Sequence, residues 1–196
     1  MTNNPKYILV HCSDTSYKIS TDQYKSVNIY HRDERQFPVS RSNQYVGYHS
    51  FITGGKNWRP REDDEVGAHC NQEYDGVTVY APGSKKALSM NLQSLGTCIG
   101  FDGDVEYPTQ ADAVMLRDQI WAWQDKYGIA TKDVRFHRDF ATGKTCPGTL
   151  ITRAWLEQLI RRVPKPSMQE LAQEPTIDLN MVVWLVAFLR KLGIIK

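Results

Sequence analysis

Short apolar runs alternate with amphipathic segments along the first 163 residues, which is the pattern of a layered α/β domain. KYILVH at 6–11 predicts a buried strand, and the polar stretch 32–45 predicts a loop. Amphipathic helices are predicted at 21–31 and 150–163. Further strands are predicted at VGYHSFI (46–52), GVTVYAP (76–82), LGTCIGF (95–101) and DVRFH (133–137). We expect a central, mostly mixed sheet flanked by helices on both faces.

The clearest helix signal lies between Thr109 and Gly128. Thr109 and Asp112 form a T-x-x-D start, which is a variant of the capping box, and Gly128 is a suitable C-cap. Apolar side chains recur at steps of three and four on one helical face: Ala113, Leu116, Ile120, Trp123 and Tyr127. For the first helix, Thr21 or Asp22 is the expected N-cap.

The pattern changes after residue 163. Residues 1–163 are predicted to form the main domain, PKPS opens a linker over 164–177, and 178–196 form an apolar and basic helical segment. Its run of apolar or small residues, 181–189, is shorter than the roughly 20 residues that a membrane-spanning helix needs. Three roles stay open for 178–196: packing on the domain, contact with a membrane surface, or a dimer contact.

Composition narrows the class of protein. The 196 residues are 41% hydrophobic and 23% charged, which fits one globular domain with a small appendage. A net charge of +2 and a pI of about 8.3 are too weak to predict a nucleic-acid partner, although they suit an anionic polymer such as a bacterial cell wall. The start MTNNPKYILV lacks a basic region followed by an apolar run, so we expect the protein to stay in the cytoplasm.

Cysteine and histidine carry the candidate metal chemistry. The four cysteines, at 12, 70, 98 and 146, are too far apart for a disulfide framework, which predicts a reduced protein. We expect Cys12, Cys70 and Cys98 to be small buried side chains.

His11 and His137 both end predicted strands, where the functional groups of open α/β sheets collect. If these strands are neighbours, both imidazoles emerge at one rim, and Cys146, nine positions after His137, can fold back to them. Two neutral imidazoles and a thiolate make a three-ligand zinc site whose open fourth position is typical of catalysis. His49 and His69 are also plausible cleft residues, so spacing alone leaves the ligand set open.

Five segments together carry a family resemblance. They are YILVHCSDT; IYHRDERQF with VGYHSFI; RPREDDEVGAHC; NLQSLGTCIGFDGD; and VRFHRDFATGKTCPG. In this order they resemble the zinc-dependent N-acetylmuramoyl-L-alanine amidases, a family that includes phage lysozyme-like amidases and animal peptidoglycan recognition proteins. The resemblance covers roughly residues 6–163.

The resemblance implies a role for each matching residue. One zinc ion would be held by His11, His137 and Cys146. Tyr48 and Lys144 match catalytic positions of the cleft. The implied substrate-binding residues are His69, Arg59 and Arg61.

The chain departs from the family pattern at three places. The cysteine follows the histidine by nine positions where the family usually has eight, and the extra residue falls near 142–143, next to Lys144. Tyr30-His31 stands where the family has Trp-His. The segment 70–90 is longer than usual, so Lys85 and Lys86 either add substrate contacts or belong to a solvated surface excursion.

The resemblance implies cleavage of the amide between N-acetylmuramic acid and L-alanine in peptidoglycan. We expect a monomeric phage endolysin that is held in the host cytoplasm until it is released to the cell wall. A cytoplasmic wall-recycling amidase fits the same residues, as does a zinc peptidase acting elsewhere in the stem peptide. A non-catalytic receptor module is the rival from another class, but such receptors tend to have lost the cysteine, and Cys146 is present.

Overall fold

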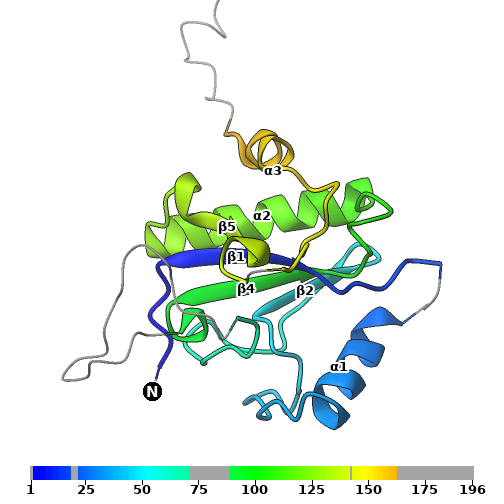
Figure 1. Cartoon of the computed structure of the whole chain (residues 1–196). Helices are drawn as coiled ribbons and strands as arrows, with labels where there is room; N and C mark the ends of the chain where they lie inside the picture. The colour runs from blue at the N-terminus through cyan, green and yellow to red at the C-terminus, as the bar shows by residue number, and fades with distance from the viewer. Residues whose placement is uncertain (1, 19–21, 71–88, 142, 163–196) are drawn as a thin grey trace, which may run out of the picture. The chain divides into compact units, whose positions relative to one another are not determined.

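Five strands form one mixed sheet within the unit Met1–Arg161 (Figure 1). Its strand order is β3-β2-β4-β1-β5. The β2–β4, β4–β1 and β1–β5 pairs are parallel, and only β3 is antiparallel to its neighbour. The strands are β1 (Tyr7–Cys12), β2 (Ser50–Thr53), β3 (Lys56–Trp58), β4 (Ser94–Ile99) and β5 (Val134–Phe136). The predicted α/β class with a mixed sheet is confirmed.

The computed structural model describes residues 2–18, 22–70, 89–141 and 143–162. The predicted strand 76–82, with the rest of the segment that holds Lys85 and Lys86, lies outside the described residues, as do the linker 164–177 and the helical segment 178–196. Among the residues that are described, no helix is both long and apolar enough to cross a membrane.

The predicted strand at 46–52 is too long, because its first four residues leave the β-ladder. The His49 side chain takes the place of a backbone partner: its Nδ1 accepts from the Gly96 N–H at 3.0 Å, while the His49 N–H donates to the Gly96 carbonyl at 2.9 Å. Regular pairing with β4 begins at Ser50. The short strand β3 was not predicted, since its three residues show no apolar run.

Three α-helices accompany the sheet: α1 (Gln23–Asp33), α2 (Gln110–Tyr127) and α3 (Arg153–Ile160). Asp22 caps α1 by accepting from the Lys25 N–H at 3.0 Å. Helix α3 is shorter than the predicted 150–163 because the Thr152 hydroxyl accepts from the Trp155 N–H and fixes its first turn.

Helix α2 has the predicted ends but not the full capping box. The Thr109 hydroxyl accepts from the Asp112 N–H at 3.2 Å, and Gly128 ends the helix with φ at 67°. The buried Asp112 carboxylate does not return to the Thr109 N–H. It accepts instead from the Tyr17 hydroxyl at 2.8 Å and from the Gly55 N–H at 2.7 Å, so it ties α2 to two loops.

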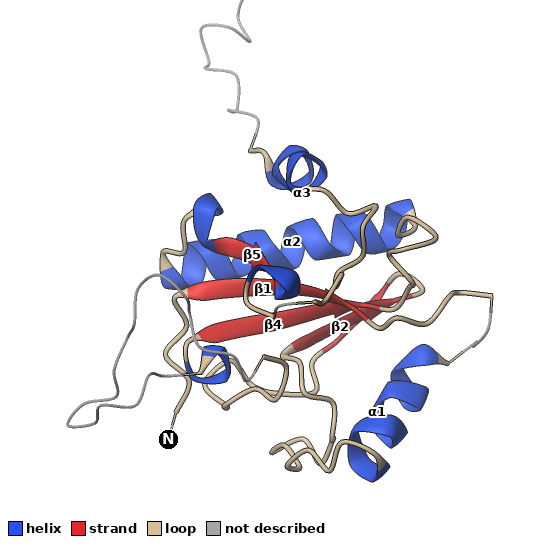
Figure 2. Ribbon diagram, viewed as in Figure 1, coloured by secondary structure: helices blue, strands red, loops and turns tan. Residues whose placement is uncertain are grey.

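The two faces of the sheet have different covers (Figure 2). Helices α2 and α3 cover one face, where Ile8, Val10 and Ile99 belong to the largest apolar cluster. On the other face, Val27 of α1 packs with Phe51 and with other buried residues. Side chains alternate along a strand, so His11 points to the same face as Phe51, away from α2. Consequently a site that contains His11 lies on the α1 side of the sheet.

A buried carboxylate ties the C-terminal end of α2 to the loop after β3. Asp63 accepts hydrogen bonds from Trp123 Nε1 at 3.0 Å, Lys126 Nζ at 2.8 Å and the Tyr127 hydroxyl at 2.9 Å, and it pairs with Arg59. Burial raises the pKa of this carboxyl, but the Lys126 and Arg59 charges outweigh burial and hold the pKa below its usual value.

We expect Asp63→Asn to lower the free energy of unfolding by about 2 kcal/mol, because the buried Trp123 N–H and its neighbours lose a charged acceptor, while Lys126 and Arg59 stay partly exposed to water. Chemical denaturation measures the loss. Asp118→Asn is the matched control: Asp118 pairs with Arg117 at the surface, so its loss should stay below about 1 kcal/mol. Equal effects of the two substitutions would contradict a special role for Asp63.

His49 makes stability depend on pH. Its Nδ1 accepts a hydrogen bond and its Nε2 lies 2.9 Å from the Glu65 carbonyl, so the folded protein needs the neutral ring. Burial lowers the pKa of His49 from 6.5 to about 4. Since the unfolded chain binds this proton more tightly, the contribution to stability is complete above pH 6.5 and is lost as the pH falls toward 4.

In the presence of EDTA, we expect the unfolding free energy of the wild-type protein to fall between pH 6.5 and 4. His49→Asn keeps an acceptor near the Nδ1 position but cannot be protonated, so its slope with pH should be smaller by up to about one proton. Urea titrations at several pH values measure both slopes. Identical slopes would mean that His49 is not one of the groups that titrate on unfolding.

Candidate metal centre

Three side chains from distant parts of the sequence meet at the carboxyl end of β1. They are His11 in β1, His137 directly after β5, and Cys146 from the following loop. One ligand atom from each lies within 4.8 Å of the other two. His11 Nδ1 is 3.7 Å from Cys146 Sγ, and the two imidazole centroids are 4.6 Å apart. The condition set out from the sequence is met: β1 and β5 are parallel neighbours, and both histidines emerge at one rim.

The chemistry of these donors fits a zinc ion. Burial lowers the pKa of His11 well below 6.5, and repulsion from His137, His69 and His31 lowers it further whenever those rings are protonated. Burial and the Lys144 charge lower the pKa of His137 to about 4, so both rings are neutral ligands at neutral pH. Contact with the Cys12 thiol and burial raise the pKa of Cys146, so the metal-free thiol keeps its proton. A metal cation would stabilise the deprotonated thiolate of Cys146. Two imidazoles and one thiolate fill three of the four positions of a tetrahedral zinc ion, so one position would stay open.

Arg138 holds the cysteine loop in place. Its guanidinium donates to the carbonyls of Thr145, Gly148 and Ile151 at 2.9, 2.6 and 2.5 Å. Its own N–H donates to the Cys146 carbonyl at 2.9 Å. The residue next to one ligand therefore fixes the loop that carries another.

Two carboxylates complete this support. Asp104 accepts from the Thr145 hydroxyl and from the Thr149 N–H, both at 2.7 Å. Asp139 accepts from the Phe136 N–H at 3.0 Å and from Arg153 at 2.9 Å, which fixes the backbone on either side of His137. Sequence reasoning did not assign roles to Arg138, Asp139 or Asp104, although the run His-Arg-Asp places the first two directly beside a candidate ligand.

The extra residue between His137 and Cys146 falls near 142–143, where Gly143 and Lys144 are the described residues. Gly143 has φ at 79°, a value that glycine adopts without strain, and the Lys144 N–H donates to the Ala141 carbonyl at 3.1 Å. Cys146 still reaches His11, and Lys144 still lines the cleft beside the centre.

A second histidine fixes the orientation of His11. His11 Nε2 lies 3.2 Å from His69 Nδ1. His11 Nδ1 faces Cys146, so a metal ion held at Nδ1 would leave the ring proton on Nε2, in position to donate to His69. Outer partners of this kind fix both the tautomer and the direction of a metal ligand.

Two glycines make room for the His69 ring. A Cβ atom on Gly96 would lie 2.6 Å from the ring, and one on Gly67 would lie 2.4 Å from it. His69 is buried, and its backbone N–H donates to Asn91 Oδ1 at 2.8 Å. The ring therefore has a fixed position beneath His11. Its use as a substrate contact stays a prediction.

We expect His69→Phe to weaken zinc binding about 10- to 100-fold, because the ring slot stays filled while His11 Nε2 loses its acceptor. His69→Asn is the matched variant, since its Oδ1 stands close to the lost Nδ1 and should restore part of the affinity. Competition with a chromogenic chelator measures the dissociation constants independently of activity. Unchanged affinity in His69→Phe would exclude the proposed support of His11.

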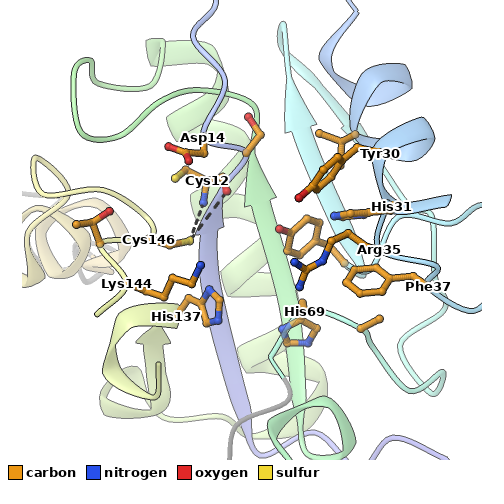
Figure 3. A pocket seen from close by; sticks show the side chains of 15 residues that line it. Cys12, Asp14, Tyr30, His31, Arg35, Phe37, His69, His137, Lys144 and Cys146 are labelled. Atoms are coloured by element: carbon orange, nitrogen blue, oxygen red, sulfur yellow. Dashed lines mark hydrogen bonds between the residues drawn. The ribbon is translucent and has the colours of Figure 1, made fainter. Parts of the chain in front are cut away.

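The candidate metal centre forms one wall of a cleft of about 260 Å³ (Figure 3). Asp14, His137, Lys144 and Cys146 lie along this wall. The opposite wall comes from the end of α1 and the turn after it, and Figure 3 shows its four labelled side chains: Tyr30, His31, Arg35 and Phe37.

Tyr48 connects the two walls. Its ring centroid is 5.0 Å from that of His11 and 5.6 Å from that of His31. Burial, followed by the Cys98, Cys146 and Cys12 thiols, raises the pKa of Tyr48 well above 10, so at neutral pH its hydroxyl keeps a proton to donate.

The structure brings some of the predicted site residues together and leaves two elsewhere. His11, His69, Tyr48, His137, Lys144 and Cys146 meet in or beside the cleft. Arg59 and Arg61 do not line it. Arg59 donates to the His49 carbonyl and pairs with Asp63, while the buried Arg61 donates to the carbonyls of Val46 and Pro38. Their guanidinium groups stabilise loops.

The sequence also matches a known protein family. The profile of the N-acetylmuramoyl-L-alanine amidase family matches residues 1–149, a range that includes all three candidate ligands. Among the curated proteins that were searched, none matches the chain.

Several solved structures share the fold. N-acetylmuramoyl-L-alanine amidase LysC from Clostridium intestinale is 22% identical, with a TM-score of 0.57 over 80% of this chain and 85% of that one. An endolysin from a Thermus scotoductus bacteriophage is 14% identical, with a TM-score of 0.57 over 82% and 87% of the two chains. Drosophila PGRP-LB is 22% identical, with a TM-score of 0.53 over 74% and 76%. At these identities the likeness shows the fold.

Proposed function

Because the chain belongs to the N-acetylmuramoyl-L-alanine amidase family, we propose that it hydrolyses the amide between N-acetylmuramic acid and L-alanine in peptidoglycan, with one zinc ion as cofactor. His11, His137 and Cys146 would hold the ion. The observation that carries this proposal is the approach of their three ligand atoms to within 4.8 Å at the edge of a cleft.

A bound zinc ion supplies Lewis acidity and an activated water to such a site. The chain's own residues then have to orient the amide and stabilise the charge that develops on its carbonyl oxygen. Lys144 lines the metal-bearing wall, and its ammonium group suits that charge. The protonated hydroxyl of Tyr48 is a second donor between the two walls. One of these two groups also delivers the proton that the leaving amine requires.

The biological setting that we propose is that of a monomeric endolysin, which stays in the host cytoplasm until it reaches the cell wall. The bacteriophage endolysin among the structural neighbours supports this setting. A wall-recycling amidase would use the same site on soluble fragments. The receptor alternative is less favoured, because Cys146 is positioned against His11 and supported by Arg138.

We expect Cys146→Ser to lower amidase activity at least 100-fold and to weaken zinc binding while the protein stays folded, because serine is a poor substitute for a thiolate ligand. Release of L-alanine amino termini from purified sacculi measures activity, and mass spectrometry of the products identifies the bond that is cut. Cys70→Ser changes a buried cysteine that does not line the cleft and should keep both zinc and activity.

Each alternative gives a different result in the same assay. Full activity of Cys146→Ser with zinc still bound would refute the ligand assignment. Products cut within the stem peptide would indicate a peptidase, and binding to sacculi without cleavage would indicate a receptor. Cleavage of soluble fragments but not of sacculi would favour a recycling amidase over an endolysin.

A further inference from the structure

Among the described residues that line the wall opposite the candidate metal centre, Arg35 is the cation. Its side chain is exposed, lines the cleft, and extends from the turn after α1 toward the cleft's middle (Figure 3). Its guanidinium carbon lies 5.7 Å from the centroid of the Phe37 ring, which is a cation–π distance. The family resemblance implied Arg59 and Arg61 as substrate-binding residues, but of these three arginines only Arg35 lines the cleft.

The backbone around Arg35 is fixed by the end of α1. The Arg35 N–H donates to the Tyr30 carbonyl at 3.1 Å, and the Phe37 N–H donates to the His31 carbonyl at 3.0 Å. Gln36 between them has φ at 51°, so the chain turns sharply here. The Arg35 side chain therefore extends from a turn whose backbone is fixed by hydrogen bonds.

Arg35 supplies the positive charge on this wall. His31 beside it is neutral, because its Nδ1 accepts from the Gly47 N–H at 3.2 Å, and because burial and the Arg35 charge lower its pKa to about 4. Among the described residues, no carboxylate forms an ion pair with Arg35, whereas Arg32 on the same helix end pairs with Asp33 at 2.6 Å. The acidic side chain of the cleft lining, Asp14, lies on the other wall.

The position of the Arg35 guanidinium favours an anionic group of the substrate between the two walls. A planar guanidinium that has no carboxylate partner of its own suits a carboxylate ligand, which it can bind through two parallel hydrogen bonds. The ring centroids of His11 and His31 both lie within 6 Å of the Tyr48 ring centroid, so the Tyr48 ring bridges the distance between the two walls. Two peptide residues span roughly 7 Å when extended, so a short peptide that starts at the metal centre reaches the opposite wall.

We propose that Arg35 is a specificity-determining residue that binds the free α-carboxylate of D-glutamate in the stem peptide. The inference rests on the proposed amidase function and names the part of the substrate that the second wall recognises. In peptidoglycan, D-glutamate follows L-alanine and is linked through its side-chain carboxyl, so its α-carboxylate is the first anionic group on the leaving peptide. When this group is amidated, the charge is absent and Arg35 has no partner.

The test uses two soluble muropeptides with tetrapeptide stems, which differ only in whether the α-carboxyl of D-glutamate is free or amidated. We expect the zinc-loaded wild-type protein to cleave the free acid with a kcat/KM about tenfold higher. Arg35→Met should lower kcat/KM for the free acid about tenfold, mainly through KM, and leave the amide unchanged. Arg35→Lys should give an intermediate value. Arg32→Met, the matched control outside the cleft lining, should change neither.

The outcomes separate failure of the carboxylate site from failure of the proposed function. Equal rates of the wild-type protein on the two muropeptides would overturn the role of Arg35, as would equal losses in Arg35→Met. Cleavage of sacculi with no cleavage of either muropeptide would place the main binding contacts elsewhere and would also overturn it. If the wild-type protein cleaves neither muropeptide nor sacculi, the proposed amidase function is wrong, and the carboxylate site falls with it.

Discussion

Parallel pairing of β1 with β5 brings His11 and His137 to one edge of the sheet, and the candidate metal centre is built around that meeting. Both strands must end at the same rim for the two rings to come within 4.6 Å of each other. The remaining parts of the centre act on this pair. His69 fixes one histidine from beneath, and Arg138 draws the cysteine loop back across the rim.

Burial gives the centre its chemistry as well as its shape. It keeps the His11 and Tyr48 rings neutral, and together with Cys12 it keeps the Cys146 thiol protonated until a cation is present. The charged side chains that line the cleft are Lys144 and Asp14 on one wall and Arg35 on the other. The opposite wall has Arg35 as its charge, so it suits the part of a substrate that is anionic beyond an uncharged reacting bond.

Local signals in the sequence were enough for much of the fold. Thr109 and Gly128 define α2 because a cap is decided by the residues next to it, and the strand ends of His11 and His137 follow from short apolar runs. Signals that depend on distant partners were not readable. Nothing in the sequence shows that Asp112 bonds to Tyr17, or that Arg59 pairs with Asp63 while Arg35 faces the cleft. The residues next to Arg59 and Arg35 in the sequence do not distinguish their roles. The carboxylates and carbonyls that surround each guanidinium come from distant parts of the chain and are known only from the fold.

The hydrogen bonds that Arg138 and Asp104 make to the cysteine loop are between protein groups, so none of them uses a metal ion as a partner. In many small metal-binding domains the ion has to order its own ligands, and the entropy of that ordering reduces the affinity. Here the polypeptide has already ordered the loop, so little further conformational entropy is lost when the ion arrives. An ion bound here would therefore keep more of its binding free energy as affinity.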